Sequence, residues 1–234
     1  MRKHIKELVL SLLVIILAVL TTTYFYKETA TNENNTTINT NIKSPKINKI
    51  EELKKKYDNN DIVGNISIDG TGIDEAILQS TDNDYYLSHD NYGNYDKYGS
   101  VFLDYRCTKD SKKLLIFGHS SIKIDTPFNN LENYYKKEYY LDHKYINLII
   151  DNEERKYLIF SVYIEPKDFT YMNLNITDET YNKDLLKYKN KSLYNTNVDI
   201  NNDDNILILQ TCSNHPNYQK YENKYLLIIA KKVS

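Results

Sequence analysis

Two residues with reactive side chains, Cys212 and His119, each stand at the end of an apolar run. Cys212 closes the run that begins at Ile206, and His119 follows Leu114–Gly118. If both runs are β-strands that end at one rim of a sheet, thiol and imidazole lie side by side, which is the minimal arrangement for nucleophilic cysteine catalysis. A free thiol, with a pKa of about 8.5, is mostly protonated at neutral pH, and a nearby imidazolium favours the thiolate.

A structural role for the same thiol is the main alternative. A cysteine after a hydrophobic strand is often a core residue or half of a disulfide, and Cys107 is the only other cysteine. His143 in a charged turn and His215 in a polar segment are expected to be solvated. The sequence contains no CxxC or HxxxH pair that would indicate a metal site, so we expect neither a metal nor another cofactor.

Short apolar runs separated by turn signals predict eight β-strands. They span residues 61–67, 73–79, 99–104, 113–118, 144–150, 155–164, 205–211 and 225–233. Because few segments have helical periodicity, the expected architecture is mainly β, with the eight strands forming a closed or nearly closed barrel.

Three segments have the apolar spacing of helices. Residues 47–57 predict a short amphipathic helix, and Thr126-Pro127 predicts the start of a helix over 128–140. A third helix is predicted over 178–190, within the connection 166–204 between the sixth and seventh strands. Such a long connection is expected to carry function, so we expect the substrate groove between it and the strand that ends at Cys212.

The N-terminus has the pattern of a membrane anchor, predicted over residues 1–26. Basic residues precede Leu8–Tyr26, an uncharged stretch of 19 residues that is long enough to cross about 30 Å of hydrocarbon as a helix. The basic flank predicts a cytoplasmic N-terminus. The alternative is a cleaved secretory signal, but no small-x-small cleavage site follows the run. Residues 27–46 are expected to be a flexible tether, and residues 47–234 an extracellular domain.

The composition excludes several classes of protein. A net charge of -2 disfavours a protein that binds nucleic acid by neutralising phosphates. Six Gly and two Cys exclude a collagen-like chain and a disulfide-dense scaffold. The 23 Tyr residues, with no Trp, are interpreted as compositional background, with many rings half-buried.

Several motifs together resemble the sortases, and class B sortases in particular. They are Phe117-Gly118-His119, Leu209-Gln210-Thr211-Cys212, Asp104-Tyr105-Arg106 and Phe128-Asn129-Asn130-Leu131. The N-terminal anchor, the amphipathic helix and the helix in the long connection fit the same family. The resemblance covers about residues 47–233 and implies the eight-stranded sortase barrel. It implies a cysteine transpeptidase that cleaves an Asn-Pro-x-Thr-type sorting signal of secreted proteins and joins them to a cell-wall amine through a thioester.

Carried over by position, the resemblance implies roles for five residues. Cys212 matches the nucleophile, and His119 matches the general acid that protonates the leaving amine. Thr211 matches the Thr beside the nucleophile. Thr211, Lys224 and Asn130 are expected to contact the substrate or the oxyanion. A backbone N–H at or beside the nucleophile is also expected to donate a hydrogen bond to the oxyanion.

The resemblance fails at the third catalytic residue of the family, an Arg on the last strand. No Arg follows Cys212, and Tyr225 stands at the expected position. A Tyr can donate one hydrogen bond but brings no charge, which Lys224 or Lys220 would have to supply. Gln210 also replaces the family's Ser two places before the nucleophile. Two hypotheses follow: an active sortase with a substituted helper, which the retained Cys and His favour, or a sortase-like domain that binds signals and cuts poorly.

The expected partners follow from the resemblance and the anchor. They are secreted proteins that bear a sorting signal, peptidoglycan or its precursor amine, and the cytoplasmic membrane. A membrane-anchored extracellular binding module remains the rival from another class, in which Cys107 and Cys212 would form a disulfide. Two free thiols would favour the enzyme.

Overall fold

The computed structural model describes residues 48–121 and 123–234, and its first element is helix α2 (Lys49–Tyr57). Asn48 caps this helix by accepting a hydrogen bond from the backbone N–H of Glu51 (3.3 Å). Ile50 and Leu53 are buried, and the helix packs against strand β1 (Ile62–Ile68). The predicted amphipathic helix is confirmed.

The anchor predicted over residues 1–26 and the tether predicted over 27–46 lie outside the described residues. Within the described part of the chain, no helix has the length and apolar character that a membrane crossing needs.

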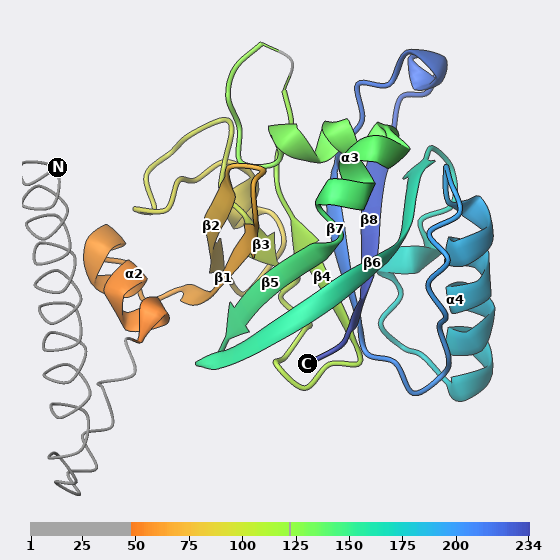
Figure 1. The fold of residues 1–234 in the computed structure, drawn as a ribbon. Coiled ribbons are helices and arrows are strands. Elements are labelled where there is room, and N and C mark those ends of the chain that lie inside the picture. The colour runs from red at the N-terminus through yellow and green to blue at the C-terminus, as the bar shows by residue number, and fades with distance from the viewer. Residues whose placement is uncertain (1–47, 122) are drawn as a thin grey trace, which may run out of the picture. The chain divides into compact units, whose positions relative to one another are not determined.

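Eight strands close into one barrel in the order β1-β2-β3-β4-β7-β8-β6-β5 (Figure 1). Their bounds, after β1, are β2 (Ile73–Leu78), β3 (Phe102–Leu103), β4 (Lys113–Phe117), β5 (Tyr145–Ile150), β6 (Glu153–Glu165), β7 (Ile206–Cys212) and β8 (Tyr225–Lys232). Most neighbours are antiparallel, but β2 with β3 and β4 with β7 are parallel. The predicted eight-stranded barrel is therefore confirmed.

The strand predicted over residues 99–104 is much shorter than expected. Only Phe102–Leu103 pair with neighbouring strands as β3. On the N-terminal side, Gly99 has a φ of 53°, which lies outside the β region. On the C-terminal side, Asp104 begins a turn in which its carbonyl accepts a hydrogen bond from the backbone N–H of Cys107 (2.9 Å). Local turn geometry at both ends thus limits this strand.

The single helix predicted over residues 128–140 is wrong. The segment forms a 3₁₀ helix, η2 (Asn129–Tyr135), and a short helix α3 (Lys137–Asp142), which are separated by the extended residue Lys136. Tyr134 and Tyr140 are both buried, although residues six positions apart point in different directions on one continuous α-helix. The break lets both rings enter the core.

The connection between β6 and β7 covers one side of the barrel (Figure 1). It contains a 3₁₀ turn, η3 (Thr170–Met172), and helix α4 (Asp178–Lys191), which confirms the helix predicted over 178–190. Thr177 and Thr180 form a reciprocal capping box at the start of α4. Tyr181, Leu185 and Tyr188 of α4 are buried against the barrel.

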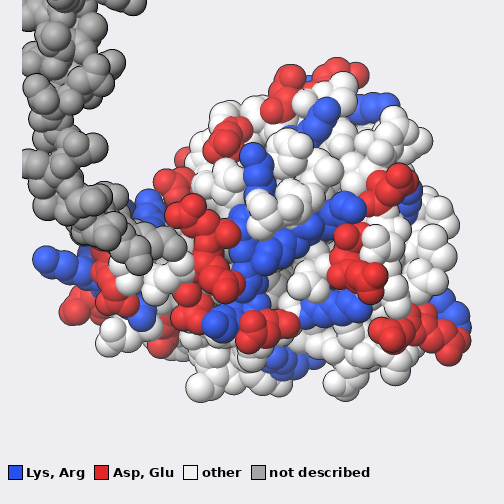
Figure 2. All heavy atoms as spheres, turned by 60° about the horizontal axis from the view of Figure 1, so that its bottom comes forward, with Lys and Arg blue, Asp and Glu red and all other residues white. Residues whose placement is uncertain are grey.

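Charged side chains are unevenly distributed over the surface. Figure 2 shows the end of the barrel that lies at the bottom of Figure 1, where Lys and Arg side chains gather in the middle of the face and Asp and Glu surround them. Strands β4 and β7 begin at this end, so their C-terminal ends, with His119 and Cys212, lie at the other.

Candidate active site

His119 and Cys212 leave two hydrogen-bonded parallel strands at the same edge of the barrel. In the β4–β7 register Phe117 lies beside Gln210, so His119 and Cys212 are the next pair along the same face. Gly118 extends the pairing by donating its N–H to the carbonyl of Gln210 (3.2 Å). The expected placement of imidazole and thiol at one rim is what the strand register produces.

A cavity of about 360 Å³ opens at this edge. It is lined by Asn83, Asp84, Leu87, Phe102, Phe117, Gly118, His119, Met172, Gln210, Thr211, Cys212 and Tyr225. Met172 belongs to the β6–β7 connection, so the cavity lies where the substrate groove is expected. The lining is mostly apolar, with a few polar groups at the thiol, which is typical of a site for a peptide or small ligand.

Both cysteines are free, so the alternative of a Cys107–Cys212 disulfide is wrong. Cys107 is buried beneath β4, where its thiol contacts the carbonyl of Lys113 (3.5 Å), and burial raises its pKa to about 11. Cys212 is exposed. Only Cys212 combines a free sulfur with access to solvent.

The surroundings of Cys212 act on its pKa in opposite directions. Partial burial of the sulfur raises the pKa of this thiol, the Lys224 ammonium lowers it, and the Glu132 carboxylate raises it. The net shift is upward, so most of the thiol is protonated at neutral pH in the free protein. Attack on a substrate therefore needs a group that favours the thiolate, and the imidazole of His119 lines the same cavity.

His119 is held by a backbone contact and by its neighbours. Its Nε2 lies 3.0 Å from the carbonyl oxygen of Leu87. Because a carbonyl only accepts, this contact assigns a proton to Nε2. The ring of Phe128 packs against Gly118, where an added Cβ would lie 2.7 Å from it. The contact fixes the backbone just before the histidine.

Three further predicted residues lie around the thiol. Tyr225 pairs with Cys212 across β7 and β8, and its hydroxyl is 3.5 Å from Oδ1 of Asn223. Thr211 is buried, and its hydroxyl has no hydrogen-bond partner among the described residues. The Lys224 ammonium donates to the carbonyl of Tyr221 (3.2 Å) and acts electrostatically on Cys212.

Asn130 is placed elsewhere. It does not line the cavity, and its amide donates to the backbone carbonyl of Thr71 (2.7 Å), in the turn between β1 and β2. His143 Nδ1 lies 2.8 Å from the carbonyl oxygen of Asp69, and His215 packs edge-on against Tyr135. Neither histidine lines the cavity, and the described residues contain no cluster of three His, Cys, Asp or Glu side chains arranged to hold a metal.

Comparisons with known proteins point to one family. The chain is 34% identical to sortase B of Listeria monocytogenes over 184 residues, which cover 77% of this chain and 74% of the relative. It is 31% identical to sortase B of Staphylococcus aureus over 194 residues, 80% of this chain and 74% of the relative. No protein-family model matches the chain. The chain belongs to the class B sortases.

Solved structures agree with this assignment. The sortase B of Clostridium perfringens superposes with a TM-score of 0.70 at 28% identity, covering 79% of this chain and 99% of that one. A complex of Staphylococcus aureus sortase B with substrate gives a TM-score of 0.70 at 28% identity, over 79% and 84% of the two chains. As a class B sortase, this protein is a cysteine transpeptidase, and its barrel is the sortase barrel.

Glu132 and Tyr135 of this sortase, which the motifs did not identify, connect the segments around the site. Oε1 of Glu132 accepts from the backbone N–H (2.9 Å) and the side-chain amide (2.6 Å) of Asn214, and from the hydroxyl of Ser120 (3.3 Å). The hydroxyls of Tyr135 and Ser213 are 2.9 Å apart. Helix η2 therefore braces the segments that follow the histidine and the cysteine.

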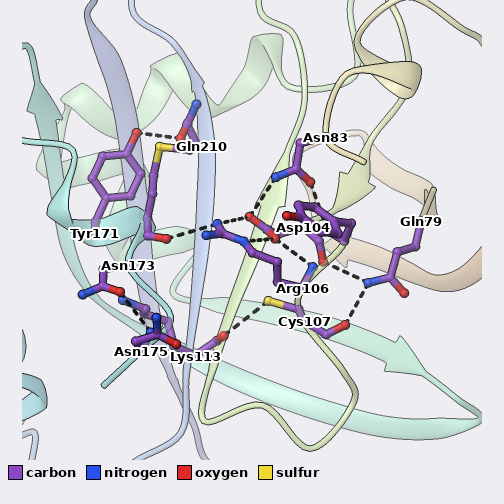
Figure 3. Close-up of polar contacts among 12 residues, drawn as sticks. Gln79, Asn83, Asp104, Arg106, Cys107, Lys113, Tyr171, Asn173, Asn175 and Gln210 are labelled. Atoms are coloured by element: carbon purple, nitrogen blue, oxygen red, sulfur yellow. Dashed lines mark hydrogen bonds and ion pairs between the residues drawn. The ribbon is translucent and has the colours of Figure 1, made fainter. Parts of the chain in front are cut away.

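The substituted Gln210 has its own partner in this sortase. Its Oε1 accepts a hydrogen bond from the hydroxyl of Tyr171 (2.6 Å), as Figure 3 shows. Tyr171 is buried and belongs to η3, next to the cavity-lining Met172. The contact fastens the β6–β7 connection to the strand that carries the nucleophile.

Proposed function

We propose that this class B sortase cleaves an Asn-Pro-x-Thr-type sorting signal after its Thr and joins the secreted protein to an amine of peptidoglycan or its precursor. Cys212 and His119 are proposed as the nucleophile and the general acid. The observation that carries the proposal is the parallel β4–β7 register, which brings both side chains into one open cavity.

In the first half-reaction the Cys212 thiolate attacks the carbonyl carbon of the signal's Thr. The C–S bond forms as the carbonyl π electrons move to oxygen, and collapse of this tetrahedral intermediate breaks the C–N bond. Protonated His119 gives its proton to the leaving amine, so the amine departs neutral. The product is a thioester between the Thr acyl group and Cys212.

In the second half-reaction a cell-wall amine attacks the thioester carbon. The new C–N bond forms, the C–S bond breaks, and the electron pair returns to sulfur as a thiolate. Neutral His119 accepts the proton that the attacking amine loses, which restores the starting protonation states. The net result is exchange of one amide for another.

Three residues are proposed to stabilise the oxyanion or position the substrate. Thr211 lines the cavity, and its hydroxyl, which has no partner among the described residues, is proposed to donate to a substrate carbonyl. Tyr225 lies beside the nucleophile and can donate one hydrogen bond. Lys224 does not line the cavity, but its ammonium acts electrostatically on Cys212 and supplies the positive charge that the tyrosine lacks. Asn130 is left out of this proposal because it does not line the cavity and its amide donates to the carbonyl of Thr71.

The location of the domain also belongs to this proposal. The charge-free stretch Leu8–Tyr26 supports a single-pass anchor with a cytoplasmic N-terminus, with the catalytic domain extracellular. Carbonate extraction and external protease treatment of intact cells test this arrangement. Retention in the membrane together with cleavage from outside supports it, and release by carbonate contradicts it.

The peptidase activity is tested on the full chain in a non-ionic detergent. Peptides of the Asn-Pro-x-Thr type and sequence-scrambled versions are incubated with the protein, and the fragments are identified by mass spectrometry. We expect cleavage after Thr by the wild type and by Cys107→Ala, and none by Cys212→Ala with unchanged circular dichroism. Undiminished cleavage by Cys212→Ala would remove the mechanism.

A further inference from the structure

A second cavity, of about 410 Å³, lies beside the start of β4. Its lining shares no residue with the Cys212 cavity. It consists of Arg106, Ser111, Lys112, Lys113, Asn173, Leu174, Asn175 and Ile176. Three of these side chains are cationic, three are neutral polar groups, and none is a carboxylate. Since a water molecule takes roughly 30 Å³ in the liquid, the space holds a phosphate-sized group with hydration.

Lys113 is the one cation among the buried polar side chains that lack a hydrogen-bond partner in the described part of the chain. It is 2% exposed, and its ammonium nitrogen has no hydrogen-bond partner among the described residues. Figure 3 places it beside Asn173 and Asn175, which line the same cavity. A buried ammonium without a partner costs free energy, because it has lost the water that would solvate it. Lys113 lines this cavity, so an acceptor bound there lies next to its side chain.

The carboxylates near Lys113 are paired with other cations. Arg106 is paired with Asp104 (2.6 Å), Lys112 with the exposed Asp178 (3.9 Å), and Lys187 with both Asp184 and Asp168 (3.3 Å each). Burial lowers the pKa of Lys113 to about 8, with Asp184 acting in the opposite direction and Lys187 and Arg106 in the same direction as burial. At pH 7 the ammonium is still mostly protonated. Among the described residues no carboxylate forms an ion pair with Lys113, whereas each of these neighbouring cations has at least one.

The neutral polar groups of the cavity can act as donors. The side-chain oxygen of Asn173 accepts the backbone N–H of Asn175 (3.0 Å), so the Asn173 amide can offer its NH₂ group to a ligand. The oxygen of Ser111 accepts the backbone N–H of Thr108 (2.9 Å), and its hydroxyl proton can rotate. Several donors and an ammonium without an ion-pair partner match a tetrahedral oxyanion, which has several acceptor oxygens and more than one negative charge.

We propose that this cavity binds a phosphate group, with the Lys113 ammonium as the charge partner and Lys112, Ser111 and the Asn173 amide around it. The ligand supplies the acceptor that Lys113 lacks, and its negative charge pairs with this ammonium. A free phosphate or the headgroup of a lipid presents the same chemistry, and the experiment separates these sources. The site is independent of the proposed peptidase activity, because the two cavities have no lining residue in common.

Titration calorimetry of the full chain in detergent tests the site, with inorganic phosphate and pyrophosphate as probes and acetate at matched ionic strength. We expect one phosphate or pyrophosphate per chain and at least tenfold weaker binding to Lys113→Met. Lys137→Met is the control, because Lys137 is an exposed lysine of α3 that does not line the cavity. Equal affinity in wild type and Lys113→Met, or equal binding of acetate, overturns the proposal.

Two further measurements keep the test decisive. Ser111→Ala leaves every charge in place and is expected to weaken binding by a smaller factor, so the test does not rest on one variant. Vesicles with phosphatidylglycerol replace the free anions in the second arm. Binding of the free anions or of the vesicles that is lost in Lys113→Met supports the site and shows whether the phosphate comes from a free anion or from a lipid. Failure of the wild type to bind either the free anions or the vesicles contradicts the proposal.

Discussion

Tyr225 lies directly opposite Cys212 on the antiparallel strands β7 and β8. The pairing puts a neutral donor at the position where the sortase family is expected to have Arg. Phe169 packs edge-on against the Tyr225 ring, with the centroids 5.7 Å apart, so the β6–β7 connection holds the ring beside the nucleophile. The charge near the sulfur comes instead from Lys224, one residue earlier in the chain.

Replacing Tyr225 tests its part in catalysis. We expect Tyr225→Arg to keep or raise kcat/KM, because a guanidinium brings both charge and two parallel donors. Tyr225→Phe should lower kcat by up to about 10²-fold if the hydroxyl donates to the oxyanion. Steady-state cleavage of a sorting-signal peptide measures both. Unchanged rates in Tyr225→Phe would show that the hydroxyl does not act in the transition state.

The pH dependence of Cys212 alkylation reports the charges around the sulfur. Glu132→Gln removes a negative charge that raises the pKa of the thiol, so the alkylation profile should shift to lower pH. Lys224→Met removes a charge that lowers this pKa, so its profile should shift to higher pH. Iodoacetamide rates across the titration provide the measurement, and Cys107→Ala is the background that removes the second thiol. Shifts in the same direction for both variants would contradict this electrostatic account.

Glu132 should also position the site through its hydrogen bonds. Glu132→Ala removes the acceptor shared by Asn214 and Ser120, so kcat should fall more than KM changes while the far-ultraviolet circular dichroism is preserved. Glu132→Gln keeps an acceptor oxygen at the same place and should retain most of kcat. Equal losses of kcat in the two variants would mean that the negative charge of Glu132, and not its hydrogen bonds to Asn214 and Ser120, matters for catalysis.

Gly118 should tolerate no side chain while Phe128 keeps its place. Gly118→Ala brings a Cβ within 2.7 Å of the Phe128 ring and is expected to cost about 1–3 kcal/mol of the free energy of unfolding. Phe128→Leu in the same chain should restore part of this loss by making room. Urea unfolding of both variants measures it, and additive losses in the double variant would rule out the proposed contact.

The parts of the fold that depend on residues close together in the sequence could be predicted. Apolar runs such as Ile206–Leu209 and the helical spacing of Tyr181, Leu185 and Tyr188 lie within short stretches of sequence, so the eight strands and α4 could be predicted. The break at Lys136 could not be predicted, because it follows from the burial of Tyr134 and Tyr140, whose partners Tyr194 and Thr196 are distant in the sequence.

Long-range contacts account for what was missed at the site. Glu132 meets Asn214 from 82 positions away, and nothing near either residue indicates it. Lys113 is the polar first residue of an apolar run, and its burial depends on tertiary packing around the cavity that it shares with residues 173–176 of the β6–β7 connection.

The most direct test of the central claim is the intact mass of the full chain after brief mixing with a sorting-signal peptide and no amine. The account predicts a population heavier by the acyl fragment, attached at Cys212 and released by hydroxylamine, in the wild type and in Cys107→Ala. Cleaved peptide without any such adduct, or an adduct that persists in Cys212→Ala, would contradict it.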